Sequence, residues 1–151
     1  MRRKVSIFGS TGSIGCNTVS LIEAQGGAET YDVVAVSGAT NIPLLADQAR
    51  KLRARIAVTS EPERFDALRD ALSGSGVEAA AGPEALVAAA AEPTDWTMSA
   101  IVGAAGLAPG LKAAEHGGVV ALANKESLVC AGQLFLDTCA RHGTRLLPVD
   151  S

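Results

Sequence analysis

Short apolar runs alternate along this chain with stretches of helical periodicity, and this alternation constrains the fold more than any other feature. The runs are rich in Val, Ile and Ala, and most of them end in glycine or in polar residues. Such runs are typical of strands buried on both faces of a parallel sheet. Strands that alternate with helices form right-handed crossovers, which place helices on both faces of the sheet. We therefore predict an α/β fold with a doubly wound, mainly parallel sheet of the Rossmann type.

The expected elements follow from this pattern. Strands are predicted over residues 5–8, 31–36, 56–58, 77–81 (weak), 98–102, 119–123 and 146–149. Helices are predicted over residues 14–25, 42–52, 62–72, 83–92, 107–115 and 126–141. Asn41 is expected to cap the second helix, with Pro43 tolerated in its first turn. No repeat or linker divides the 151 residues, so we expect residues 1–151 to form one domain.

Composition narrows the functional class. A net charge of -3 gives no reason to expect nucleic acid or an anionic membrane as a partner. No apolar stretch reaches the length of a signal core or a membrane span, so we expect a cytoplasmic protein. Cys16, Cys130 and Cys139 form no C-x-x-C pair and are expected to be reduced, buried apolar groups. His116 and His142 each precede a glycine, which suggests structural roles at helix ends.

A glycine-rich segment lies between the first strand and the first helix. It reads GSTGSIG at residues 9–15. Glycines at such a junction let the backbone approach a pyrophosphate, and the helix start offers free N–H groups to the anion. Thr11 and Ser13 add hydroxyl donors. The alternative is a glycine-rich turn needed only for packing. The G-x-x-G-x-x-G spacing differs from that of the commonest NAD dehydrogenases.

The end of the second strand bears on the choice of cofactor. NAD enzymes usually place Asp or Glu there to bind the adenosine ribose, but residues 36–41 read VSGATN and contain no acid. A carboxylate would repel a 2′-phosphate, so its absence favours NADPH over NADH. Ser37, Thr40 and Asn41 are candidate donors to that phosphate. Asn41 is equally suited to a helix cap, which is compatible with both roles.

Two later strands also end in polar residues. Asn124, Lys125 and Glu126 start a helix directly after a strand, where a lysine can meet an anionic substrate group. The alternative is a helix cap at Asn124 with a solvated Lys–Glu pair. Asp150 and Ser151 follow the last strand, and an Asp carboxylate suits Mg²⁺ or Mn²⁺. One carboxylate does not complete a metal site.

Four segments together resemble one enzyme family. They are GSTGSIG at residues 9–15, AIVGAAG at 100–106, LANKESL at 122–128 and LPVDS at 147–151. In order and spacing they are similar, over the whole chain, to the 1-deoxy-D-xylulose 5-phosphate reductoisomerases, and the last three are quite specific to that family. The resemblance implies that residues 1–151 are the amino-terminal NADPH-binding domain of a longer chain, and that the catalytic and carboxy-terminal domains lie outside them.

The resemblance also implies a reaction. It is the NADPH-dependent rearrangement and reduction of 1-deoxy-D-xylulose 5-phosphate to 2-C-methyl-D-erythritol 4-phosphate, in isoprenoid precursor biosynthesis. A divalent metal, Mg²⁺ or Mn²⁺, chelates the substrate oxygens, and NADPH supplies the hydride. The implied full-length enzyme is a homodimer that takes a phosphorylated sugar, without nucleic acid or membrane partners. No catalytic set is complete here, so this chain alone is expected to be inactive.

Site residues carry over by position. For the cofactor the resemblance implies Thr11, Gly12, Ser13, Ile14, Gly38, Asn41, Asn124 and Glu126. The first four would hold the pyrophosphate, and the next two would lie by the adenosine end. Lys125 and Ser151 would bind substrate, and Asp150 would ligate the metal, with two further glutamate ligands beyond Ser151.

One departure and two alternatives remain. Many relatives have a lysine before the asparagine of the second loop, where this sequence has Thr40, so recognition of the 2′-phosphate is expected to be weaker or built differently. A semialdehyde dehydrogenase-like NADP enzyme has a similar glycine loop, but it would need a nucleophilic cysteine in its next domain. A cofactor-binding module without catalysis is the other alternative.

Overall fold

The computed structural model describes residues 2–123 and 125–149, with backbone alone at residues 125–127 and 130. A seven-stranded sheet has the order β4-β3-β2-β1-β5-β6-β7. All six strand pairs are parallel. The strands are β1 Arg3–Phe8, β2 Tyr31–Gly38, β3 Ile56–Thr59, β4 Glu78–Ala81, β5 Trp96–Ser99, β6 Val119–Leu122 and β7 Arg145–Pro148. The doubly wound fold is thereby confirmed.

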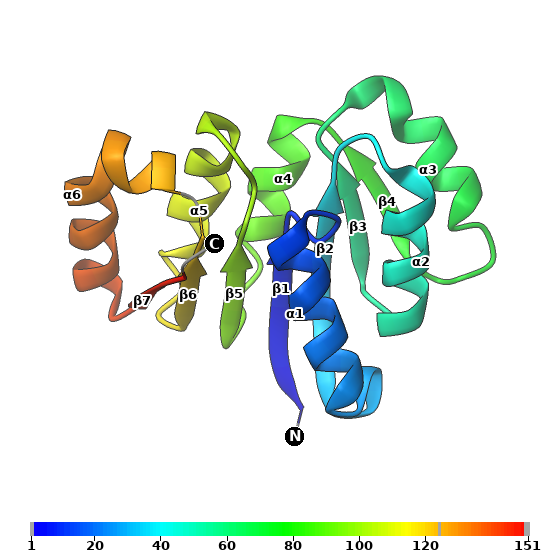
Figure 1. The fold of residues 1–151 in the computed structure, drawn as a ribbon, viewed down its shortest axis with the longest axis horizontal. Coiled ribbons are helices and arrows are strands. Elements are labelled where there is room, and N and C mark those ends of the chain that lie inside the picture. Colours follow the sequence, from blue (N-terminus) through cyan, green and yellow to red (C-terminus); the bar gives the residue numbers. More distant parts are fainter. Residues whose placement is uncertain (1, 124, 150–151) are drawn as a thin grey trace.

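The helices connect these strands across both faces of the sheet (Figure 1). They are α1 Ser13–Ala24, α2 Ile42–Leu52, α3 Phe65–Ala71, α4 Pro83–Ala90, α5 Leu107–Ala113 and α6 Lys125–His142. Three 3-10 turns, Gly27–Glu29, Pro62–Arg64 and Ala104–Gly106, precede β2, α3 and α5. No helix in the described part of the chain combines the length and the apolar character that a membrane crossing requires.

Two hydrophobic cores lie on opposite faces of the sheet. One contains the inward side chains of α1, α2 and α3, among them Val19, Leu45 and Leu68, against Val5 and Ile7 of β1. The other joins α4, α5 and α6 to the opposite face, through the buried residues Phe8, Val34, Leu86, Ala114 and Cys139. Because β1 contributes side chains to both cores, helices on both faces of the sheet hold its carboxyl end in place. That end carries the glycine segment.

The strand order reverses its direction of growth at β1. From β1 the chain adds β2, β3 and β4 on one side, and then β5, β6 and β7 on the other. In open α/β sheets, ligands bind beyond the carboxyl ends of the strands at such a switch point. The loops after β1 and β5 meet there, and Figure 1 shows both at the same edge of the sheet.

Two expected elements differ from the structure. The strand expected over 98–102 is wrong at both ends, because β5 is Trp96–Ser99 and Val102 is 87% exposed. Its neighbours end at the same level, at Phe8 and Leu122, so no partner remains to extend the ladder. The single long helix expected after residue 125 is broken at Ala131, whose φ of -145° is not helical. Gly132 follows the break, and glycine lowers the cost of leaving the helix.

Candidate cofactor site

Two glycines of the first loop are required by the packing of the protein itself. Gly9 has a φ of +85°, and a Cβ there would lie 2.6 Å from the carbonyl oxygen of Ala100. A Cβ on Gly15 would lie 2.0 Å from the carbonyl oxygen of Gly9. Both contacts are with backbone, which cannot move aside cheaply. The close turn therefore depends on glycine at these two positions.

Gly12 is different, because no atom of the described residues requires a glycine there. Its φ is -78°, it is the N-cap of α1, and it is exposed. A Cβ on Gly12 would meet only the carbonyl oxygen of Gly9, at an ordinary 3.6 Å. The space that a side chain would fill lies open in front of the helix start. Such a position fits the glycine that lets a pyrophosphate approach the backbone.

The amino end of α1 also fits an anion. No side chain caps this helix, and its first turn contains no acidic residue. Ser13 and Ile14 form the start of the helix, and Ser13 is exposed. The first N–H groups of a helix have no intrahelical partner and carry the positive end of its dipole. The residues present are therefore suited to bind a phosphate group.

A buried polar network holds the first loop against β2 and α2. The backbone N–H of Ser10 donates to the carbonyl oxygen of Ser37 over 2.8 Å, and the backbone N–H of Gly9 donates to Ser37 Oγ over 2.9 Å. The hydroxyl of Ser10 lies 2.7 Å from Gln48 Oε1, and Gln48 Nε2 donates to the carbonyl oxygen of Ser10 over 2.9 Å. Ser10, Ser37 and Gln48 are at most 4% exposed. This network fixes the path of the loop.

The second loop, after β2, packs directly on the first. A Cβ on Gly38 would lie 3.0 Å from Thr11 Oγ1, so glycine there lets the two loops approach. From the next strand, Thr59 Oγ1 donates to the carbonyl oxygen of Ala39 over 2.7 Å. Thr59 is fully buried. The second loop is thus supported from β3 as well as from β1.

The three polar candidates of the second loop have different environments. Ser37 is 1% exposed and its hydroxyl accepts from the Gly9 backbone N–H, so it offers little surface to a 2′-phosphate. Thr40 and Asn41 are exposed. Asn41 caps α2 as predicted, with its Oδ1 accepting from the Leu44 backbone over 3.2 Å. The amide nitrogen of Asn41 is a donor that this capping bond does not use.

A pocket of about 180 Å³ lies where these loops meet. It brings together Thr11, Gly12 and Gly38 of the predicted site with parts of the loops after β3 and β5. Its lining is Gly9, Thr11, Gly12, Ser37, Gly38, Ala39, Ser60, Leu86, Ala100, Ile101 and Val102. Ser60, Leu86 and Ile101 were not anticipated from the sequence. Ser60 and Ile101 lie in loops that follow strands, which is the signal that points to them, whereas Leu86 lies within α4 and carries no such signal.

The remaining predicted site residues lie outside the description. Asn124, Asp150 and Ser151 are not among the described residues, and the side chains of Lys125 and Glu126 are not described. Among the described residues, no group of three His, Cys, Asp or Glu side chains can hold a metal ion. The predicted metal ligand Asp150 is not tested by that finding.

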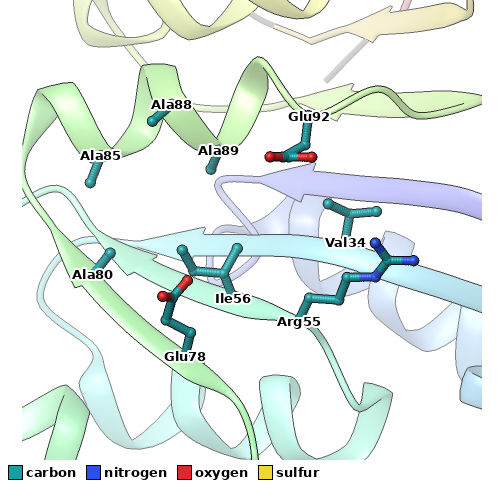
Figure 2. A pocket seen from close by; sticks show the side chains of 9 residues that line it. All are labelled: Val34, Arg55, Ile56, Glu78, Ala80, Ala85, Ala88, Ala89 and Glu92. Atoms are coloured by element: carbon teal, nitrogen blue, oxygen red, sulfur yellow. The ribbon is translucent and has the colours of Figure 1, made fainter.

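A larger pocket, of about 400 Å³, lies away from this edge (Figure 2). Its residues include the first residues of β3 and β4, so it opens at the amino ends of the strands. The lining is Val34, Arg55, Ile56, Glu78, Ala80, Ala85, Ala88, Ala89 and Glu92. The pocket exists because α4 presents only alanines to the strands at this level. Its position is opposite to the one where ligands bind in such sheets.

The cysteines and histidines behave mainly as structural groups. Burial raises the pKa of the Cys139 thiol, and Cys139 is a free, buried cysteine as predicted. Cys16 is free but only half-buried, and the side chain of Cys130 lies outside the description. Burial lowers the pKa of His116, which follows α5. None of the cysteine and histidine side chains that the structure describes lines the pocket where the loops meet.

This fold and this site define a class. A glycine loop that joins the first strand to a helix at the switch point of a parallel sheet is the site of a dinucleotide-binding domain of the Rossmann class. Comparison with known proteins gives the particular family. The family model for 1-deoxy-D-xylulose 5-phosphate reductoisomerase matches residues 5–132, and the chain belongs to that family.

Individual relatives agree with this assignment. The 1-deoxy-D-xylulose 5-phosphate reductoisomerase of Ruegeria pomeroyi is 68% identical over 149 residues, which are 99% of this chain and 37% of that protein. The solved structure of the Zymomonas mobilis enzyme in complex with NADPH has a TM-score of 0.96 and 50% identity, and covers 100% of this chain and 39% of its own.

A further solved structure is a DOX-P reductoisomerase in complex with NADPH, fosmidomycin and magnesium. Its TM-score is 0.91 at 36% identity, over 99% of this chain and 36% of its own. The chain thus spans less than two fifths of the length of the relatives it matches. Between the two enzyme families considered from the sequence, these matches favour the reductoisomerase over the semialdehyde dehydrogenase.

Proposed function

We propose that this chain is the NADPH-binding part of a 1-deoxy-D-xylulose 5-phosphate reductoisomerase. The observation that carries the proposal is the open space in front of Gly12, at an uncapped helix start that faces the switch point. The packing of the described residues does not need that glycine, whereas the close approach of a pyrophosphate to the backbone does. Membership of the reductoisomerase family, whose solved members include NADPH complexes, supports the same cofactor.

Each part of the site has its own task in this proposal. Thr11, Gly12, Ser13 and Ile14 bind the pyrophosphate through backbone N–H groups and hydroxyls. Gly38 and Asn41 lie beside the adenosine ribose, and Asn124 and Glu126 contact the cofactor further along. NADPH, when bound, supplies the hydride for reduction of the rearranged substrate. The chain's own residues bind and orient the cofactor.

The choice of NADPH over NADH rests on the second loop. No carboxylate stands at the end of β2, where an acidic residue would bind the ribose hydroxyls of NAD and repel a 2′-phosphate. Thr40 is exposed beside Asn41, and both can donate a hydrogen bond to a phosphate oxygen. A neutral donor is weaker than the charge of a lysine. We therefore expect a preference for NADPH that is real but modest.

The proposal extends to the whole enzyme. Lys125 and Ser151 bind the phosphorylated sugar substrate, and Asp150 is one ligand of a Mg²⁺ or Mn²⁺ ion. The support is the match of the segments at residues 122–128 and 147–151 to the family. The complete protein is a cytoplasmic homodimer with no nucleic acid or membrane partner. Residues 1–151 form its cofactor domain, and the catalytic domain is a further part of that enzyme.

The test is a calorimetric titration of the protein with NADPH and, separately, with NADH. We expect NADPH to bind at least about tenfold more tightly, a difference of roughly 1.4 kcal/mol. Equal affinity for both would keep the dinucleotide site but overturn the argument from the missing acid. Binding of neither cofactor would overturn the proposal for this chain. Gly12→Val, which fills the open space, is expected to abolish binding and serves as the negative control.

A further inference from the structure

Gln48 is the one polar residue on the inward face of α2. It is 4% exposed, and the same face carries the buried residues Ile42, Leu45, Ala46, Ala49 and Leu52. Burying an amide in an apolar core is costly unless its donors and acceptor find hydrogen-bond partners. If apolar packing were the only requirement at this position, a leucine or a methionine would meet it. The presence of a glutamine therefore calls for a reason.

The partners of Gln48 supply that reason, because all of them lie on the pyrophosphate side. Its Oε1 accepts from the Ser10 hydroxyl over 2.7 Å, and its Nε2 donates to the Ser10 carbonyl oxygen over 2.9 Å. The Nε2 group also lies 3.7 Å from Cys16 Sγ, in the first turn of α1. One side chain of α2 thus contacts both the first loop and the start of the first helix.

The same helix begins in the second loop. Its N-cap is Asn41, which the proposed function places beside the adenosine ribose. Ser10, in turn, donates its backbone N–H to the carbonyl oxygen of Ser37 at the end of β2 over 2.8 Å. Gln48 therefore connects the two loops that would hold opposite ends of the same half of a dinucleotide. Its bonds to the first loop are direct, whereas the link to the second loop runs through Ser10 to Ser37 and along α2 to Asn41; all the groups involved are neutral.

We propose that Gln48 is a positioning residue for the cofactor, which acts through Ser10 to hold the pyrophosphate loop in its binding conformation. The proposal rests on the proposed function, since it takes the first loop to be the pyrophosphate site. When the loop is held in advance, ordering it costs nothing at the moment of binding. Without Gln48, Ser10 keeps its backbone bond to Ser37 but loses both bonds to α2, so part of the cost of ordering the segment from Ser10 to Gly12 falls on cofactor binding.

The central experiment compares Gln48→Met with a matched control. Methionine keeps the length and the apolar contacts of the glutamine but has no strong hydrogen-bonding group. Leu68→Ala removes a fully buried side chain of α3 that forms none of the hydrogen bonds of this network, so it lowers stability and leaves those bonds in place. NADPH affinity is measured by fluorescence titration, and the melting temperature of each cofactor-free variant is measured in parallel.

We expect Gln48→Met to raise the NADPH dissociation constant at least tenfold, and Leu68→Ala to leave it within twofold although its melting temperature falls. Ser10→Ala, which removes only the hydroxyl of the network, is expected to raise the constant by a smaller factor. This variant also serves if Gln48→Met does not fold. An unchanged constant in the Gln48 and Ser10 variants, or an equal rise in the Leu68 control, would overturn the positioning role.

A second substitution of Gln48 gives a pH dependence of NADPH affinity that a purely structural role would not produce. In Gln48→Glu, the ionised carboxylate can accept from the Ser10 hydroxyl but would face the Ser10 carbonyl oxygen without a proton. The protonated carboxyl regains the donor of the amide. Because burial raises the pKa of a carboxyl, we expect the NADPH affinity of this variant, relative to the original protein, to improve severalfold as the pH falls from 8 to about 5.5.

The outcomes separate the two proposals. If the original protein does not bind NADPH, the proposed function fails and the variants carry no information on a cofactor site. If the original binds NADPH and the Gln48→Glu affinity ratio is flat with pH while Gln48→Met binds normally, only the positioning role fails. Tight binding by the original together with the tenfold loss and the pH-dependent ratio supports both.

Discussion

At the residue scale, alanine is expected to have different effects at two glycines of the segment 9–15. At Gly15 it mainly lowers stability, and at Gly12 it mainly weakens cofactor binding. Gly15→Ala places a methyl group 2.0 Å from the carbonyl oxygen of Gly9, so the backbone must shift. We expect it to lower the free energy of unfolding by about 3 kcal/mol. Gly12→Ala meets no atom nearer than 3.6 Å, so its cost is that of an alanine at an N-cap, about 1 kcal/mol or less.

The cofactor affinities distinguish the roles of these two residues. Gly12→Ala is expected to weaken NADPH binding more than about tenfold in a protein that still melts cooperatively, because the methyl group occupies the approach to the helix start. Urea unfolding and a cofactor titration on the same samples give both quantities. A normal affinity in Gly12→Ala would show that the open space is not where the pyrophosphate lies.

At the scale of elements, α4 offers a place where the packing can be improved. Ala85 is half-buried and lines the pocket of about 400 Å³ between α4 and the amino ends of β3 and β4 (Figure 2). Ala85→Leu adds apolar surface to this hollow without entering the cofactor loops. We expect the free energy of unfolding to rise by about 1 kcal/mol. Ala88→Leu, on the exposed rim, is the control and is expected to gain less.

The bounds of the elements show where sequence patterns reach their limit. Residues 98–102 are all apolar or small, so the pattern alone extends the strand to Val102, but the ladder ends at Ser99. The length of a strand is set by its neighbours β1 and β6, which lie far away along the chain. The cap at Asn41 was predictable because it depends on residues within one turn.

At the scale of the whole molecule, the site residues also divide into those set by local sequence and those set by contacts between distant parts of the chain. Thr11, Gly12 and Gly38 were predictable because each lies at the carboxyl end of a strand or just after it, and the rule of the switch point places them together. Gln48 and Ser37 were not, since their roles depend on contacts across 38 and 28 positions of the chain. The only sequence signal was a glutamine at an inward position of an otherwise apolar helix face. Hydrogen bonds between residues far apart in the chain produce no periodic pattern in the sequence, so the sequence does not predict them.

The stability of the whole molecule towards acid is expected to depend in part on the half-buried ring of His116. Burial lowers the pKa of His116 from its ordinary value of 6.5, against the smaller opposing effect of Glu115 and Glu92, while Lys112 lowers it further. The folded state therefore favours the neutral ring. Between 6.5 and the lower folded pKa, the unfolded chain binds more protons, so stability is present above that window and is lost as the pH falls through it. His116→Gln removes this titration. The free energy of unfolding, measured with urea at pH 7.5 and at pH 5.5, is expected to differ less between the two pH values in this variant than in the original protein. His142→Gln, at an exposed position, is the matched control. An equal pH dependence in the original and in His116→Gln would mean that other groups govern the acid side of the stability curve.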